Sequence, residues 1–108
     1  MNSRRDVVLA RVHFSDSTES KVRPAIIVSN KEYHKTNFFL LASITTSNDE
    51  YCIPISKNDV NCFLNENSHA RFDGIQKLHS KLIIKRIGKV NPEFQEKLVE
   101  KIIATLKH

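Results

Sequence analysis

The sequence of 108 residues contains only two glycines, Gly74 and Gly88, and no tryptophan. Two isolated glycines cannot build the glycine-rich loop that cradles nucleotide phosphates, so a nucleotide-binding site of that kind is excluded. No apolar run approaches the length of a membrane span, and no apolar segment follows the charged N-terminus. We therefore expect neither a membrane protein nor a secreted one, and we predict a single cytoplasmic domain over residues 1–108.

Cysteine is also scarce. Cys52 and Cys62 lie ten positions apart and lack Cys-x-x-Cys spacing, so the four ligands of a structural zinc site are missing. We expect both thiols to be reduced. No cluster of carboxylates that could hold magnesium is apparent, and no Gly-x-Ser-x-Gly nucleophile elbow is present. The sequence therefore predicts no metal, no cofactor and no covalent nucleophile.

Short apolar segments separated by polar turns predict a mainly β protein. A polar stretch, residues 15–21, predicts an exposed loop that could gate a site. Asn91 and Pro92 predict a helix start, and the helix should run to about Thr105 with its apolar stripe packed in the core. We expect a small curled antiparallel sheet or barrel covered by this helix. The expected strands are residues 6–14, 25–28, 38–44, 51–55, 67–78 and 82–87.

Arg23 stands at the entrance of the apolar run 25–28, immediately before Pro24. The proline holds the preceding residue extended, so the guanidinium should project from the edge of the core, where it could bind phosphate or carboxylate. The alternative is an ordinary surface arginine beside a turn.

A second candidate cluster alternates along one strand. His69, Arg71 and Asp73 should point outward, while Ala70 and the following aromatic residue point inward. A histidine, a cation and a carboxylate in one row can perform acid–base chemistry. The alternative is an arginine–aspartate ion pair beside a solvated histidine. Gly74, which follows, is expected to mark a bulge or kink.

The formal net charge of +5 favours a polyanionic partner. Without a metal, the chemistry open to such a protein on RNA is attack by a 2′-hydroxyl on the adjacent phosphate. That reaction needs a base, a proton donor for the leaving oxygen and cations for the developing charge. Asp73 is a candidate base, and His69 is a candidate base or acid. The two arginines would supply charge, and Thr45 and Thr46 would supply hydroxyl donors.

The order of these segments resembles the MazF/PemK (Kid) family of toxins, over essentially the whole chain. The matching segments are Asp-Val-Val near the N-terminus, Val-Arg-Pro-Ala-Ile-Ile-Val-Ser-Asn, Leu-Ala-Ser-Ile-Thr-Thr, Ser-His-Ala-Arg-Phe-Asp, and Asn-Pro-Glu before the helix. The run from Arg-Pro into four apolar residues is the most specific of them.

This resemblance implies an SH3-like β-barrel with a C-terminal helix, a homodimer, and a metal-independent endoribonuclease. Such toxins cut single-stranded RNA to 2′,3′-cyclic phosphate and 5′-hydroxyl ends, and a cognate antitoxin neutralises them and binds DNA with them. By the resemblance, Arg23, Thr45, Arg71 and Asp73 are catalytic, with Arg71 assigned mainly to transition-state charge and the proton donor left open. The implied RNA-binding residues are Lys21, Thr46, Ser47, His69, Gln76 and Lys77.

The sequence departs from the family pattern at three places. Arg5 replaces the usual glycine before the first strand, and residues 73–77 replace an Asp-Gln-Ile-Arg-Thr run. His69 stands where an apolar or aromatic residue is more common. The departures at residues 74–77 keep open a degenerate member that binds only antitoxin or RNA. A separate alternative on the same barrel is a non-catalytic CcdB-like protein that binds gyrase. The RNA motif depends on the loops, which include residues 57–67, and the sequence does not give it.

Overall fold

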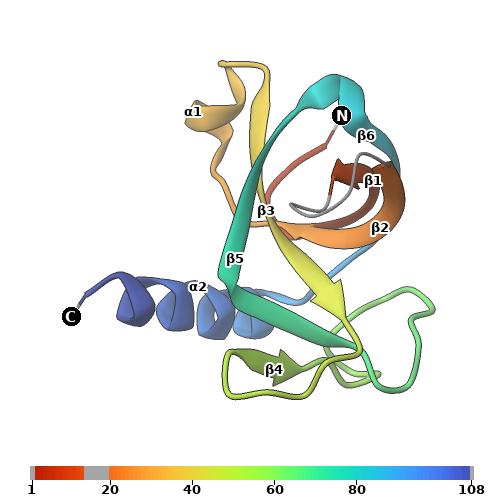
Figure 1. The fold of residues 1–108 in the computed structure, drawn as a ribbon, viewed down its shortest axis with the longest axis vertical. Helices are drawn as coiled ribbons and strands as arrows, with labels where there is room; N and C mark the ends of the chain where they lie inside the picture. Colours follow the sequence, from red (N-terminus) through yellow and green to blue (C-terminus); the bar gives the residue numbers. More distant parts are fainter. Residues whose placement is uncertain (1, 14–19, 108) are drawn as a thin grey trace.

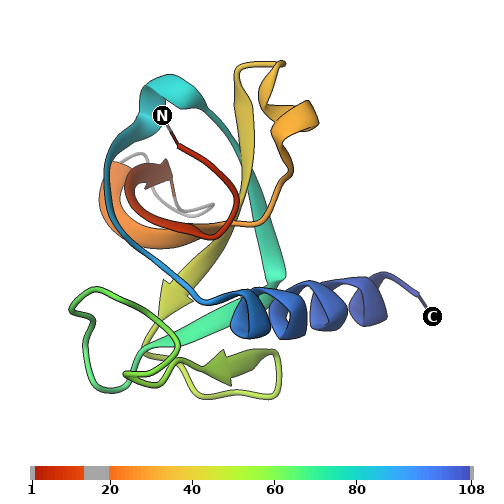
Figure 2. The ribbon, with the colours of Figure 1, turned by 180° about the vertical axis from the view of Figure 1, so that it is seen from behind.

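A computed structural model describes residues 2–13 and 20–107 (Figures 1 and 2). Six strands form one antiparallel sheet in the order β4-β5-β3-β2-β1-β6. The strands are β1 (Asp6–His13), β2 (Ser20–Ile27), β3 (Phe38–Thr45), β4 (Cys52–Pro54), β5 (His69–His79) and β6 (Ile83–Lys89). Helix α1 (Lys31–His34) precedes β3, the 3-10 helix η1 (Ser80–Leu82) precedes β6, and helix α2 (Pro92–Leu106) follows it.

The predicted mainly β fold with a C-terminal helix is confirmed. The sheet curls strongly, but in the part of the chain that the structure describes its two edge strands, β4 and β6, do not pair. The barrel is therefore open. None of the described helices is long and apolar enough to span a membrane.

The sheet buries apolar side chains on both faces, as the nearly continuous apolar run of β3 predicts. Because neighbouring residues of a strand point to opposite faces, β3 contributes to two separate clusters. One cluster lies toward α2 and contains Val7, Ile26, Ala42, Ile44, Ala70, Phe72, Phe94 and Leu98. The other lies inside the curl and contains Val8, Ala10, Val12, Ala25, Ile27, Phe39 and Leu41. The two clusters hold the middle strands rigidly between them.

Strand β2 begins earlier than predicted. Ser20 and Lys21 already belong to it, so Arg23 lies within the strand rather than at its entrance. The cause is a long ladder with β1 that extends from Ile26, opposite Val7, to Ser20. The rest of the predicted gating loop, residues 15–19, lies outside the described residues.

Strand β5 is long and irregular at the point where a bulge or kink was predicted. Its ladder with β3 pairs Ala42 with Ile75 and then Ile44 with Ala70, so β5 holds extra residues opposite β3. Gly74 lies in this bulge, which confirms the prediction. The bulge bends β5 so that its first half can also pair with β4.

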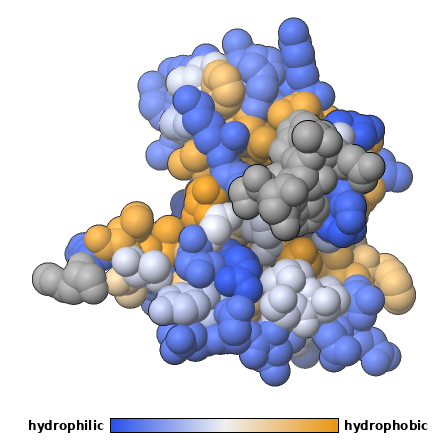
Figure 3. All heavy atoms as spheres, in the orientation of Figure 1, coloured by the Kyte–Doolittle hydropathy of each residue, from blue (hydrophilic) through white to orange (hydrophobic). Residues whose placement is uncertain are grey.

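Helix α2 begins as predicted, because the Asn91 side-chain oxygen accepts the Phe94 N–H at 2.7 Å. The prediction that its whole apolar stripe packs in the core was wrong. Leu98 is fully buried, whereas Ile103 and Leu106 are 45% and 80% exposed. The reason is that α2 runs past the edge of the sheet (Figures 1 and 2). Its projecting end carries an apolar surface (Figure 3).

Arg5 adopts a left-handed backbone conformation with φ of 77°. Glycine occupies this region without strain, whereas other residues do so at a cost of about 1–2 kcal/mol. The Arg5 backbone N–H donates to the Ile27 carbonyl at 3.0 Å, and its carbonyl accepts from the Val90 N–H at 2.9 Å. The conformation is therefore held by the strands on either side of β1.

Candidate functional site

Arg71, on β5, binds two carboxylates. Its Nη1 donates to Asp73 Oδ1 at 2.9 Å, and its Nη2 donates to Asp49 Oδ2. These hydrogen bonds, first that with Asp49 and then that with Asp73, raise the pKa of Arg71 above its usual range. The hydrogen bond from Arg71 also lowers the pKa of Asp49. The guanidinium is therefore a fixed positive charge, and it is held in place from two sides.

His69 and Thr45 lie next to each other across the β3–β5 ladder, where they are direct partners. On its other side, His69 pairs with Pro54 of β4. Paired residues share a face of the sheet, as do residues two apart in one strand. Thr45, His69 and Arg71 are therefore on the same face.

The Thr45 hydroxyl is oriented by the turn that follows β3. Its Oγ1 accepts the backbone N–H of Ser47 at 3.1 Å. This leaves the hydroxyl hydrogen available to donate to another acceptor, such as a phosphate oxygen. Thr46 and Ser47 are exposed beside it.

Arg23 approaches this face from β2. The β2–β3 ladder pairs Ala25 with Ser43 and continues toward Leu41. Arg23 is two residues before Ala25, and Thr45 is two residues after Ser43, so both are on the face of that pair. The ladder between the two strands does not extend as far as these residues. Arg23 is exposed, and Lys21 follows it at the next position on that face. The register thus places the four predicted catalytic residues on one face of the sheet, on the adjoining strands β2, β3 and β5.

Two of the predicted RNA-binding residues lie elsewhere on β5. Gln76 pairs with Leu41 and shares the face of Thr45, four residues further along β3. Lys77 pairs with Leu40, which lies five residues from Thr45 on the opposite face, or about 17 Å along the strand. Its ammonium is 4.5 Å from the centre of the Phe38 ring. Neither residue converges with the cluster around Thr45.

Asp49 is the residue of the site that sequence reasoning missed. It lies in the polar turn after β3, a segment from which the sequence pattern predicts only hydroxyl donors. Its partner Arg71 is 22 residues away, so no local spacing reveals the pair. An exposed aspartate in a turn is also common, because its side chain caps the backbone, as the 2.9 Å bond from the Tyr51 N–H to Asp49 shows.

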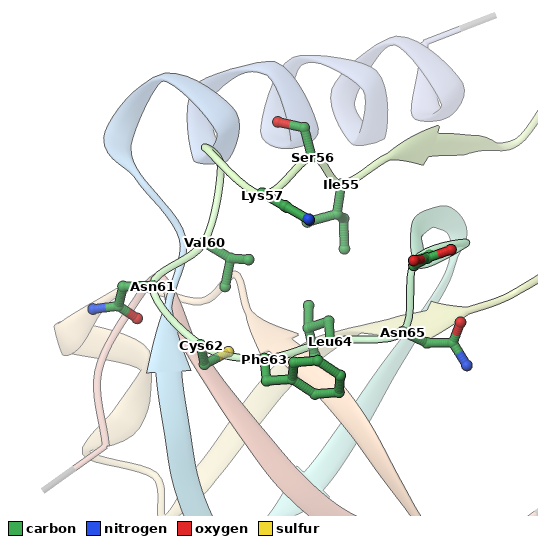
Figure 4. Close-up of a pocket in the computed structure, with 10 residues that line it drawn as sticks. Ile55, Ser56, Lys57, Val60, Asn61, Cys62, Phe63, Leu64 and Asn65 are labelled. Carbon is green, nitrogen blue, oxygen red and sulfur yellow. The ribbon is translucent and has the colours of Figure 1, made fainter.

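A pocket of about 770 Å³ is lined by residues within the range 55–66, in the loop that connects β4 to β5. Ile55 and Leu64 point toward one another across it, and Val60 lines a third side (Figure 4). Phe63, also on this loop, is 95% exposed. No group of three or more potential metal ligands occurs among residues 2–13 and 20–107.

The fold and the site define a small basic β protein with guanidinium, hydroxyl and imidazole groups gathered on one face of its sheet. Residues 3–106 match the family described as PemK-like, MazF-like toxin of type II toxin-antitoxin system. Because the match covers nearly the whole sequence, the chain belongs to this family.

Solved structures share the fold at low sequence identity. The Mycobacterium tuberculosis toxin MazF-mt6 has a TM-score of 0.72 at 20% identity, with 94% of each chain covered. An endoribonuclease in complex with its cognate antitoxin, from a mycobacterial species, has a TM-score of 0.66 at 20% identity, with 97% of this chain and 93% of that chain covered. MazE-MazF from Deinococcus radiodurans has a TM-score of 0.76 at 13% identity, with 97% and 95% covered. No curated protein sequence matches the chain.

Proposed function

We propose that the protein is a metal-independent endoribonuclease toxin that cuts single-stranded mRNA and so inhibits translation and growth. Membership of the toxin family supports this function, and one structural neighbour is described as an endoribonuclease. The observation that carries the proposal is the placement of Thr45, His69 and Arg71 on one face, with Arg23 on the same face of the adjoining strand β2.

The chemistry proposed is attack by the RNA 2′-oxygen on the adjacent phosphate, which yields a 2′,3′-cyclic phosphate and a 5′-hydroxyl. Charge builds on the non-bridging oxygens in the transition state, and Arg23 and Arg71 would stabilise it. The Thr45 hydroxyl would donate to one of these oxygens. Asp73, predicted as half of an acid–base pair, would fix Arg71 through their ion pair.

The neighbouring polar groups would hold the RNA strand. Lys21, Thr46, Ser47 and His69 would surround the reacting phosphate, and Gln76 would contact a nucleotide further along the same face. Lys77, on the opposite face, could reach the RNA only beyond the edge of the sheet. The pocket of residues 55–66 would receive a base and contribute to the choice of cleavage motif, since single-stranded RNA is recognised through splayed bases and aromatic stacking.

Cleavage of a long single-stranded transcript in EDTA, with the ends mapped, tests this function. We expect fragments with cyclic-phosphate and 5′-hydroxyl ends. Arg23→Ala should lower the rate by about 100-fold or more, because it removes a cation from the developing charge. Arg11→Ala is the matched control, since Arg11 is an exposed arginine on β1 whose position faces the other side of the sheet. Equal cutting by Arg23→Ala and Arg11→Ala would refute the site.

Two alternatives are distinguished by this experiment together with a gyrase DNA-cleavage assay. If the purified protein yields no cyclic-phosphate ends but causes DNA cleavage complexes to accumulate with gyrase, it is a CcdB-like gyrase-binding toxin. If it does neither and only binds RNA or antitoxin, it is a degenerate member of the family. The ion-paired Arg71 beside Thr45 favours the ribonuclease, because a gyrase-binding toxin does not need this cluster.

We also propose a cognate antitoxin, a homodimer and a cytoplasmic location. Two of the structural neighbours are toxin–antitoxin complexes, and the net charge of +5 suits an acidic antitoxin segment. The projecting end of α2, with Ile103 and Leu106 exposed, is an apolar surface that a second copy could cover. Light scattering should give twice the chain mass, and Leu106→Asp should shift it toward the monomer if α2 forms the contact.

A further inference from the structure

His69 occupies the centre of the candidate site, between β3 and β4. It is the direct partner of Thr45 on one side and of Pro54 on the other. Its side chain is partly buried, and it shares a face with Arg71. An imidazole at this point is next to the hydroxyl and the guanidinium that would bind the reacting phosphate.

The ring of His69 is fixed by one hydrogen bond. Its Nδ1 lies 2.7 Å from the carbonyl oxygen of Asn67. A carbonyl oxygen can only accept, so Nδ1 carries the hydrogen and donates it. In the neutral ring, the lone pair is then on Nε2. The backbone of the turn before β5 thereby leaves Nε2 as the proton acceptor of the ring.

The other polar groups of the site are poorly suited to take a proton. Arg71 stays charged, because its ion pairs raise its pKa. The pKa of Asp49 is lowered, chiefly by the hydrogen bond from Arg71. Asp73 uses Oδ1 to accept from Arg71, and Thr45 uses Oγ1 to accept from the backbone.

We propose that His69 Nε2 is the general base of RNA cleavage, an inference that rests on the proposed function. Nε2 takes the proton of the 2′-hydroxyl as the 2′-oxygen forms a bond to phosphorus. The bond from phosphorus to the 5′-oxygen breaks, and that oxygen takes a proton from water. The products are a 2′,3′-cyclic phosphate, a 5′-hydroxyl, an imidazolium and the hydroxide left by that water, and the imidazolium and hydroxide then recombine through solvent to neutral imidazole and water. Asp73 then positions Arg71 and does not act as the base.

The decisive variant is His69→Asn. The asparagine amide can still donate to the Asn67 carbonyl from near the place of Nδ1, but it has no group equivalent to Nε2. We expect the single-turnover cleavage rate of the folded variant at saturating RNA to fall by about 100-fold or more, a much larger loss than that in its affinity for a non-cleavable, 2′-deoxy-substituted oligonucleotide. Imidazole added to His69→Gly should restore part of the lost rate.

The leaving group separates a base from an acid. An RNA whose 5′-bridging oxygen is replaced by sulfur needs little protonation of the leaving group, so the loss in His69→Asn should persist on it if His69 is the base. A loss that disappears on the sulfur substrate would make His69 the acid and overturn the assignment. Wild-type rates in EDTA from His69→Asn would refute it and leave the ribonuclease standing. No cutting by the wild type would refute both.

A pH profile gives a further readout. A general base must be unprotonated, so the wild-type rate should fall toward acidic pH, and His69→Asn should lose that acidic limb. The charged groups of β5 and β2 on the face of His69 are Arg71, Asp73, Arg23 and Lys21. Asp49, on the loop before β4, is bonded to Arg71, and the Cys52 thiol on β4 lies opposite Arg71. An unchanged limb in His69→Asn would contradict the assignment.

Discussion

Gly88 on β6 packs directly against the loop that joins β4 to β5, and a single added methyl group tests this contact. A Cβ added there would lie 2.5 Å from Cβ and Sγ of Cys62 and 2.9 Å from Oδ1 of Asn61. The segment carrying these residues is fastened to β6 by two hydrogen bonds, from the Lys89 N–H to Asn61 Oδ1 at 2.7 Å and from the Asn61 N–H to the Lys89 carbonyl at 3.2 Å. Gly88→Ala must therefore push this segment of the pocket loop away.

The cost can be estimated from these contacts. Loss of two hydrogen bonds costs about 1–3 kcal/mol, and overpacking adds about 1–3 kcal/mol. Against this, alanine restricts the unfolded chain and returns about 0.4–1 kcal/mol. We expect Gly88→Ala to lower the free energy of unfolding by about 2–4 kcal/mol, measured by urea denaturation with circular dichroism.

Gly74→Ala is the matched control. It lies in β5, also without a positive φ, and its added Cβ would meet only the side chain of Arg71, with Cδ at 3.4 Å and Cγ at 3.9 Å, which is ordinary contact with a flexible side chain. Its free energy of unfolding should stay within about 1 kcal/mol of the wild type. If the two alanine variants unfold at the same urea concentration, the close packing of Gly88 against Asn61 and Cys62 is refuted.

Two further changes test the ion pairs of the site and the strained backbone. Asp49→Asn should tighten binding of an RNA oligonucleotide roughly threefold and steepen its salt dependence, because Nη2 of Arg71 becomes available to phosphate. Glu50→Gln is the control, since it removes the same charge one residue away. An equal gain in affinity from Glu50→Gln would show that only net charge matters. Arg5→Gly should raise the free energy of unfolding by about 0.5–1 kcal/mol in urea, because relief of the left-handed strain exceeds the entropy cost of glycine; a lower stability would mean that the Arg5 side chain contributes more than its backbone costs.

The sequence by itself determined the features that depend on neighbouring residues. Strand positions follow from apolar runs, and the double burial of β3 follows from its unbroken run. Asn91 and Pro92 mark the start of α2 because capping uses groups three residues apart. Gly74 marked the bulge of β5, since an isolated glycine inside a strand pattern is typical of a bulge.

Only the tertiary structure decided which of these segments meet. Ladder register sets Thr45 beside His69, and the pairing of β4 with β5, which sets Cys52 opposite Arg71, brings Asp49 to Arg71 across 22 residues. The outer half of α2 is exposed because the sheet ends beneath it, although its apolar period continues unchanged. Arg23 lies inside β2 because β1 extends the ladder beyond the apolar run. Hydrophobic period and capping are local, whereas register, curl and the extent of a sheet depend on partners that are distant in the chain, so no spacing in the sequence records them.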